Sequence, residues 1–294
     1  MSELLDFGDE ACREVARAGG KGASLARMSA LGLPVPPGFV VPAECLAAAL
    51  PDGGEALRAA LPDAGRAQAA LAGAEPPAAI AEAYAALGGD LPVAVRSSAC
   101  AEDSDAASYA GQQETYLHIR GAGAVRDKVR ECWASFFSER AIFYRERKGS
   151  LDDLGMAVVV QRMVEAEVAG VLFTCDPVRQ RRDRMVVEAV LGLGEAAVSG
   201  AVTPDHYVLA RDGKVKRAHV AVQPFAIVPL PDGGTEERAL SAEEGGAQKL
   251  SEELLRELAR IGDDLEQRLG GPQDVEWALQ GGELFVLQAR PVTA

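Results

Sequence analysis

Apolar residues in the first half of the chain repeat at helical spacing between short apolar runs that predict strands. Leu25, Met28 and Leu31 share one helical face, and Gly32 with the prolines after it ends that helix. Val129, Cys132 and Trp133 lie on one face of a later, longer helix, which predicts contact with the core. The elements predicted here are a helix at residues 22–31, strands at 39–41 and 91–95, short alanine-rich helices within 44–86, and a long helix at about 124–147.

In the second half, apolar strands alternate with turns. The predicted elements are strands at residues 156–161, 168–173, 185–191 and 206–210, followed by a polar helix at about 241–269. Strands and helices in this proportion predict a mixed α and β fold.

The C-terminal residues predict a β-hairpin around Gly281 and Gly282, and two registers compete. A two-residue turn would set Glu276 opposite Leu287 and mix polar with apolar residues on both faces. A three-residue loop at 281–283 places Glu276 opposite Gln288 and gives one wholly apolar face, so we predict this register. Its apolar pairs are Val275 with Ala289, Trp277 with Leu287, and Leu279 with Phe285.

The polar face of that hairpin has the chemistry of a metal–phosphate site. Glu276 and Gln288 would present a carboxylate and an amide oxygen side by side, with Arg290 two residues further along the strand. Such oxygens can hold Mg²⁺ against phosphate groups. The alternative is a half-exposed hairpin with an ordinary polar face.

Arg96 ends a predicted strand and begins a loop of small and hydroxyl-bearing residues. A guanidinium fixed at a strand end can grip phosphate oxygens in pairs, and small residues let backbone N–H groups approach an anion. The hydroxyls are those of Ser97, Ser98, Ser104, Ser108 and Thr115. A solvated surface loop with a salt-bridged arginine is the alternative.

Two glycine-rich stretches also suggest nucleotide binding. Lys21 lies among glycines at a helix start, where an anion is favoured, but Val15 and Gly22 occupy positions where a Walker loop needs Gly and Ser or Thr. Residues 192–197 match a dinucleotide fingerprint, yet Gly200 and Pro204 follow too soon for the long helix that such a fold requires.

Composition narrows the classes of function. The chain has 294 residues and a formal net charge of −14, which argues against general binding to nucleic acid or an anionic membrane. Five singly spaced cysteines indicate reduced thiols, with neither zinc-type spacing nor a disulfide framework. No signal peptide or long apolar run is evident, so we expect a cytoplasmic protein.

Taken in order, the motifs resemble one family: the ATP-binding domain of phosphoenolpyruvate synthase, pyruvate phosphate dikinase and rifampin phosphotransferase. The resemblance covers nearly the whole chain and rests on GGKGASLARMSALGLPVPPGFVV, VRSSA through GQQETY, VVVQRMV, AGVLFTCDP, EAVLGLGEAAVSGAVTPD, DVEWAL and LQARPVT. It implies an α+β fold of the ATP-grasp type, with mixed sheets and flanking helices. The expected lobes are residues 1–160, with the phosphate-binding cations and a mobile loop, and 161–294, with the adenine-binding strand and the magnesium hairpin.

The resemblance also implies a role for individual residues. Lys21 and Arg96 would hold phosphates, Arg290 would brace the transferring phosphoryl group, and these three would be catalytic. Glu276 and Gln288 would bind Mg²⁺, with Glu188 as a further metal-side carboxylate. The other ATP-binding residues would be Gly111, Gln112 and Thr115 in the mobile loop and Gln161, Arg162, Met163 and Val164 in the strand beside adenine, where Arg162 would act through its main chain.

The reaction implied is transfer of the β-phosphoryl group of ATP to a histidine on a separate domain, with release of AMP and phosphate. The chain ends at Ala294, where a linker to such a domain is expected, and His118, His206 and His219 lack the setting of the acceptor. We therefore expect a partner protein that carries the phosphohistidine domain. A non-catalytic nucleotide-binding module and an ATP-grasp carboxylate–amine ligase are the alternatives, and the final acceptor stays open among pyruvate, an antibiotic hydroxyl and other alcohols.

Overall fold

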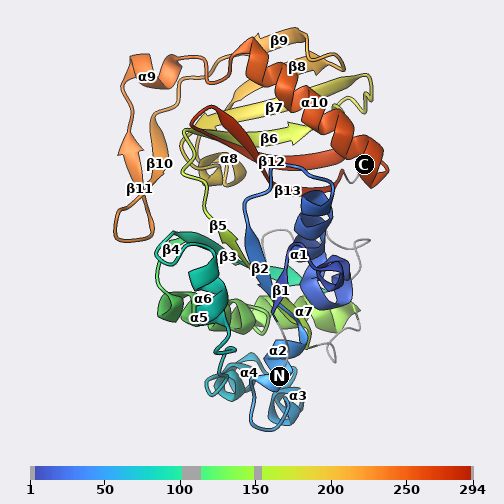
Figure 1. Ribbon diagram of the computed structural model, residues 1–294, viewed down its shortest axis with the longest axis vertical. Coiled ribbons are helices and arrows are strands. Elements are labelled where there is room, and N and C mark those ends of the chain that lie inside the picture. Colours follow the sequence, from blue (N-terminus) through green and yellow to red (C-terminus); the bar gives the residue numbers. More distant parts are fainter. Residues whose placement is uncertain (1–3, 101–113, 149–153, 293–294) are drawn as a thin grey trace. The chain divides into compact units, whose positions relative to one another are not determined.

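The computed structural model describes residues 4–100, 114–148 and 154–292, with only the backbone of Lys148. The chain divides into two compact units. Unit 1 comprises Met1–Leu33, Pro37–Met163 and Asp232–Gly234, and unit 2 comprises Pro34–Pro36, Val164–Pro231 and Thr235–Ala294. Both units combine a sheet with flanking helices, which confirms the predicted α+β class (Figure 1).

Unit 1 is built on a five-stranded sheet with the strand order β1-β2-β5-β3-β4. Its strands are β1 (Leu5–Asp6), β2 (Gly38–Val41), β3 (Val93–Ala99), β4 (Thr115–Ile119) and β5 (Met156–Arg162). Its helices are η1 (Glu10–Arg13), α1 (Val15–Ala30), α2 (Glu44–Ala48), α3 (Glu55–Ala60), α4 (Ala64–Leu71), α5 (Ile80–Ala86), α6 (Ala122–Ser135) and α7 (Glu139–Lys148).

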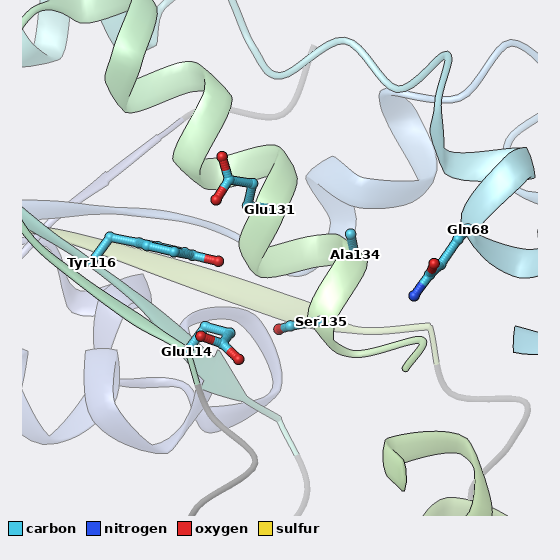
Figure 2. Close-up of a pocket in the computed structure, with 6 residues that line it drawn as sticks. All are labelled: Gln68, Glu114, Tyr116, Glu131, Ala134 and Ser135. Carbon is cyan, nitrogen blue, oxygen red and sulfur yellow. The ribbon is translucent and has the colours of Figure 1, made fainter. Parts of the chain in front are cut away.

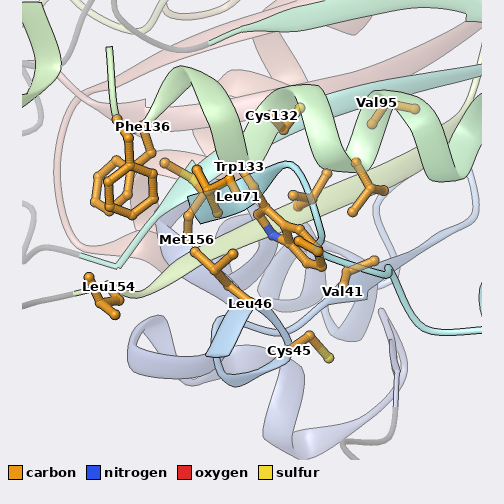
Figure 3. Close-up of a cluster of buried hydrophobic side chains, with 14 of the residues drawn as sticks. Val41, Cys45, Leu46, Leu71, Val95, Cys132, Trp133, Phe136, Leu154 and Met156 are labelled. Carbon is orange, nitrogen blue, oxygen red and sulfur yellow. The ribbon is translucent and has the colours of Figure 1, made fainter. Parts of the chain in front are cut away.

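The core of unit 1 lies between the sheet and α6. Trp133 is fully buried there and packs with valines of β3 and β5 and with apolar residues of the short helices (Figure 3). Val129 and Cys132 on the same helical face are also fully buried, so the prediction that this helix faces the core is confirmed. Truncating a tryptophan in such a position costs about 3–5 kcal/mol of stability.

Unit 2 contains a six-stranded sheet with the order β13-β12-β6-β7-β8-β9 and a separate hairpin of β10 and β11. Its strands are β6 (Val168–Phe173), β7 (Arg184–Leu191), β8 (Asp205–Ala210), β9 (Val215–His219), β10 (Phe225–Pro229), β11 (Thr235–Ala239), β12 (Gln273–Gln280) and β13 (Glu283–Pro291). Its helices are α8 (Glu195–Val198), α9 (Ala242–Gly246) and α10 (Glu252–Leu269). Figure 1 shows α10 lying across one face of the six-stranded sheet.

The named strands pair only in antiparallel fashion within the described residues. One parallel contact is an isolated bridge between Gly192 and Ile227. The sequence led us to expect mixed sheets, and the described strands instead form antiparallel sheets. No helix in the described ranges combines the length and the apolar character needed to cross a membrane.

Two predicted long helices are each broken by a serine that caps a new helix. The helix predicted at 124–147 consists of α6 and α7, because the Ser138 hydroxyl accepts a hydrogen bond from the Ala141 N–H at 3.3 Å. The helix predicted at 241–269 consists of α9 and α10, because Ser251 caps α10 by accepting from the Leu254 N–H.

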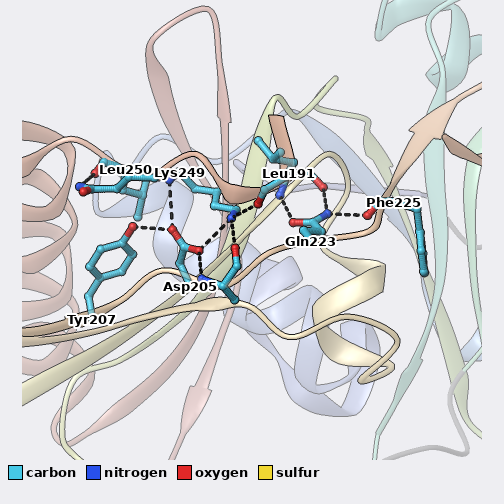
Figure 4. A network of polar contacts seen from close by, with 10 residues as sticks. Leu191, Asp205, Tyr207, Gln223, Phe225, Lys249 and Leu250 are labelled. Carbon is cyan, nitrogen blue, oxygen red and sulfur yellow. Dashed lines mark hydrogen bonds and ion pairs between the residues drawn. The ribbon is translucent and has the colours of Figure 1, made fainter. Parts of the chain in front are cut away.

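A fully buried ion pair joins distant parts of unit 2. Lys249 Nζ lies 2.9 Å from Asp205 Oδ1 and also donates to the Ala221 and Gly245 carbonyls at 2.8 Å (Figure 4). Asp205 accepts further hydrogen bonds from the Tyr207 hydroxyl and from the N–H groups of Ala221 and Lys249. The network therefore satisfies both buried charges and ties β8 to the segment before α10.

The C-terminal hairpin combines the two registers that the sequence allowed. Glu276 is opposite Gln288, as predicted, but Trp277 is opposite Val286 and the loop is the two-residue turn of Gly281 and Gly282. The predicted pairs Trp277 with Leu287 and Leu279 with Phe285 are therefore wrong. Both glycines have positive φ, which suits the twist of a hairpin turn, and a β-bulge after Glu276 absorbs the one-residue difference.

Candidate functional site

Three of the predicted ATP-binding residues lie on one face of the sheet in unit 1. Arg96 on β3 is directly opposite Thr115 on β4, and residues opposite each other on neighbouring strands point to the same face. Gln161 on β5 is opposite Ala94, two positions before Arg96, and so belongs to the same face. Arg96 and Gln161 are buried, whereas Thr115 is exposed. Because β3 continues to Ala99, Arg96 lies within a strand and not at its end.

Helix α1 brings Lys21 to this same face. A Cβ added at Gly22 would lie 3.0 Å from a methyl of Val40 and 3.6 Å from one of Val159, and both valines point to the side that carries Arg96. The Gly22 N–H donates to the Ser98 hydroxyl at 3.2 Å, and Lys21 Nζ donates to the Ser97 carbonyl at 3.0 Å. The ammonium group of Lys21 is thus anchored one residue away from Arg96 in β3.

Gly19 explains how the helix can come so close to β3. It has a φ of +68°, which kinks α1 two residues before Lys21. A Cβ at this position would lie only 2.2 Å from the Ser98 Oγ and 2.3 Å from the Ser98 carbonyl oxygen. The position therefore requires glycine both for its backbone conformation and for the close approach.

The hydroxyls of the two serines after Arg96, which the sequence suggested for a ligand, donate to main-chain carbonyls within the protein. Ser97 donates its hydroxyl to the Glu114 carbonyl at 3.2 Å, and Ser98 donates to the Ala18 carbonyl at 2.9 Å. Both side chains hold the strand and helix in place. Ser104, Ser108, Gly111 and Gln112 lie outside the described residues.

In the segment expected to contact adenine, some main-chain N–H groups already donate hydrogen bonds within the protein. The Arg162 N–H donates to the Pro37 carbonyl and the Met163 N–H to the Pro92 carbonyl, both at 2.9 Å. Val164 is buried, and within the described residues its N–H makes no hydrogen bond. Any main-chain donor for a base in this segment is therefore the Val164 N–H and not those of the two residues before it.

Two polar cross-strand pairs lie side by side in unit 2. Glu276 is opposite Gln288, and Asp274 is opposite Arg290, all on the face of the hairpin away from Val275. Arg290 donates from Nε to Asp274 Oδ2 at 2.8 Å, and the Nη2 atom is 2.8 Å from the same oxygen. Burial raises the pKa of the Asp274 carboxyl above its usual value, Arg290 opposes the rise, and the charge of Glu276 adds to it.

Asp274 was missed in the sequence prediction, although its position two residues before Glu276 places both carboxylates on the same face of a strand. The ion pair of Asp274 also fixes the position of Arg290. The guanidinium is half exposed and held by a carboxylate.

The oxygen-rich pair of Glu276 and Gln288 fits a magnesium ion. Mg²⁺ prefers carboxylate and carbonyl oxygens, and it commonly binds one or two carboxylates together with phosphate oxygens and water. Across the described residues, no three side chains of His, Cys, Asp or Glu are arranged to hold a metal by themselves. This hairpin therefore suits a metal that arrives with a phosphate ligand.

Glu188 lies in the same row of the sheet as Glu276. Val171 on β6 is opposite both of them, so the two carboxylates share a face with one strand between them.

A pocket of about 330 Å³ in unit 1 contains none of the predicted site residues. It is lined by Gln68, Glu114, Tyr116, Glu131, Ala134 and Ser135 (Figure 2). Glu114 and Tyr116 flank Thr115 in β4 and therefore point to the opposite face from it. Its two carboxylates give this pocket negative charge, unlike the face of the sheet that carries Lys21 and Arg96.

The family model described as "Pyruvate phosphate dikinase, AMP/ATP-binding domain" matches residues 15–294. The chain belongs to this family. The predicted resemblance is thereby confirmed, and the protein is an ATP-binding domain of the phosphoenolpyruvate synthase and pyruvate phosphate dikinase type.

Relatives of known name agree with this assignment. A protein named "Probable phosphoenolpyruvate synthase" from Methanocaldococcus jannaschii is 42% identical over 96% of this chain and 26% of its own length. A protein of the same name from Methanothermobacter thermautotrophicus is 41% identical over 100% of this chain and 46% of its own length. A "Rifampicin phosphotransferase" from Bacillus cereus is 34% identical over 99% of this chain and 36% of its own length. The chain thus spans less than half of the length of these family members.

Proposed function

We propose that the chain binds MgATP and transfers the β-phosphoryl group to a histidine on a separate phosphohistidine domain, with release of AMP and phosphate. Family membership supports the binding of ATP. The observation that carries the proposal further is the grouping of Lys21, Arg96, Thr115 and Gln161 on one face of the sheet in unit 1.

In this proposal, Lys21 and Arg96 bind phosphate oxygens. Lys21 is held by the Ser97 carbonyl and Arg96 is buried within β3, so neither cation has to be ordered when the phosphates arrive. In phosphoryl transfer the protein mainly positions the reacting groups and neutralises the charge on the phosphates, and fixed cations can do both. Thr115 would add a hydroxyl from the strand opposite Arg96.

The main chain next to Gln161 would recognise adenine. The N–H groups of Arg162 and Met163 are committed to Pro37 and Pro92, so the proposed donor is the Val164 N–H. Carbonyl groups of the same segment would accept from the exocyclic amine of the base.

In unit 2, Glu276 and Gln288 would hold Mg²⁺, which when bound neutralises phosphate charge. Arg290 would approach the transferred phosphoryl group from the neighbouring cross-strand pair, and Asp274 would fix its orientation. Glu188 is proposed as a carboxylate on the metal side because it lies on the same face, in the same row of the sheet.

The accepting histidine would belong to a domain outside the described residues. His118 is only 2% exposed, so a phosphoryl group could not reach it without opening the fold. His206 and His219 lie on β8 and β9 at the edge of the six-stranded sheet.

Calorimetric titration of ATP into the wild-type chain, with and without Mg²⁺, tests the binding site. Arg96→Ala should lose most of the affinity, whereas Arg120→Ala, which removes a cation bonded to the Asp90 carbonyl, should bind as the wild type does. Equal affinity of the two variants would contradict the role of Arg96.

The transfer step is tested by adding a histidine-bearing segment of a relative in trans and separating the nucleotide products. AMP together with labelled histidine on the added segment supports the proposal. ADP as the product would indicate ligase-type chemistry, and binding without turnover would indicate a non-catalytic module. AMP formed without the added segment, with label on one of the chain's own histidines, would also contradict it.

A further inference from the structure

Two of the three histidines of the chain lie directly opposite each other on neighbouring strands. His206 on β8 pairs with His219 on β9, and the bulge between these strands falls further along, after Val208. Side chains in such a pair have Cβ atoms about 4.5–5.5 Å apart and point to the same face of the sheet. The two imidazoles are therefore neighbours although 12 residues separate them in the sequence.

Both imidazoles are accessible and uncommitted within the described residues. His219 is exposed and His206 is partly exposed. Neither side chain makes a hydrogen bond, an ion pair or a ring contact with another described residue. This differs from a core histidine, whose ring nitrogens are normally satisfied by the surrounding protein.

We propose that His206 and His219 form a binding site for a late first-row transition-metal ion such as Zn²⁺, Ni²⁺ or Cu²⁺. Imidazole nitrogen suits these metals, whereas Mg²⁺ prefers oxygen. The site is thus chemically distinct from the hairpin of Glu276 and Gln288, and it does not depend on the proposed phosphoryl transfer.

The neighbouring charges and the number of protein ligands indicate an open metal site. Glu188 is opposite His206 on the other side and adds negative charge to the row, while Arg217, two residues before His219, adds a positive charge. No group of three ligating side chains occurs among the described residues, so two histidines would bind and water would complete the coordination shell. Such an open site binds more weakly than a closed four-ligand site.

Metal binding here would fasten an edge strand. β9 is the last strand of its sheet, and all five of its residues are exposed. A metal held by one histidine from each strand would link β9 to β8 and would stabilise the folded state in proportion to its occupancy.

The test is titration of Ni²⁺ and, separately, Zn²⁺ into the full chain after removal of metals with a chelator. The wild type should bind one ion per chain and melt at a higher temperature in its presence. His206→Gln and His219→Gln should each weaken the binding by more than about tenfold and abolish the thermal shift, since loss of a ligand exceeds the loss of an outer-sphere partner.

Control variants test whether other side chains of the chain bind the metal ion instead of the two histidines. Cys100→Ser tests the partly exposed thiol and Glu276→Gln tests the magnesium hairpin, and both should bind Ni²⁺ as the wild type does. Circular dichroism of the histidine variants should match that of the wild type, as both positions are on the sheet surface. Absence of binding to the wild type, or unchanged binding in both histidine variants, would overturn the proposal.

Discussion

Asp274 holds Arg290 through a single carboxylate oxygen. Arg290 Nε and Nη2 both lie 2.8 Å from Asp274 Oδ2, and the acid side chain is 12% exposed whereas the arginine is 53% exposed. The pair therefore joins a largely buried acid to a cation whose other N–H groups can reach an anion in solvent.

Replacing Arg290 by glutamine should raise the pKa of Asp274 further, because Arg290 is the group that lowers it. A carboxyl whose pKa is higher in the folded than in the unfolded state binds more protons when folded, so the free energy of unfolding falls as pH rises through this range. From about pH 4 upward, Arg290→Gln should show a steeper fall than the wild type in urea unfolding at a series of pH values.

The control for this experiment is the double variant Asp274→Asn with Arg290→Gln. It lacks the titrating carboxyl, and the additional slope should disappear. A slope that persists in the double variant would assign the effect to other groups.

Glu276→Gln should weaken the binding of ATP mainly when Mg²⁺ is present. The substitution keeps the size of the side chain but removes the charge that favours a hard cation. Calorimetry should show a loss of about 10- to 100-fold with Mg²⁺ and little change without it. Glu283→Gln, on the exposed side of the same hairpin at its turn, should leave both affinities unchanged.

Gly19→Ala should destabilise unit 1 more than Gly32→Ala does. Both glycines have a positive φ, but a Cβ at Gly32 meets no atom within 4 Å, whereas at Gly19 it meets Ser98 at 2.2 Å. Gly32→Ala should cost about 1–2 kcal/mol for the backbone conformation alone. Gly19→Ala adds about 1–3 kcal/mol for the clash, and urea unfolding curves of the two variants measure the difference.

Lys249→Met should destabilise the fold by about 3–5 kcal/mol, because it leaves the carboxylate of Asp205 buried without its cation. The double variant Lys249→Met with Asp205→Asn removes both charges and should recover part of that loss. Thermal or chemical unfolding of the three proteins forms the test. A double variant less stable than the single one would contradict this account.

The spacing of apolar residues along the chain predicts much of the fold. Apolar spacing correctly placed Trp133 on a core-facing helix, and short apolar runs located β5, β6 and β7. Two helix breaks were missed, although Ser138 and Ser251 are residues that favour helix starts. Across the first of these breaks the apolar spacing continues, with Phe136 before it and Ile142 after it.

Other features depend on contacts between distant parts of the sequence. Lys249 and Asp205 are separated by 44 residues, and no local pattern indicates that they meet. Likewise, the hydroxyls of Ser97 and Ser98 looked available for a ligand because the sequence does not show that Glu114 and Ala18 receive their hydrogen bonds. The assignment of Lys21 and Arg96 to phosphates came from the order of motifs and stays a prediction that the proposed titrations address.

The β-bulge in the C-terminal hairpin lies between two stretches of regular pairing. On the turn side, Gly281 and Gly282 fix the pairing of Trp277 with Val286, and on the far side Glu276 meets Gln288 in the other register. Leu287 is the unpaired residue of β13 at this bulge, so deleting it would join Val286 to Gln288 and leave Glu276 opposite Gln288 in one continuous register. The extra residue is thus not required for the pairing of the polar side chains, and what it adds is the local bend and stronger twist of a bulged strand.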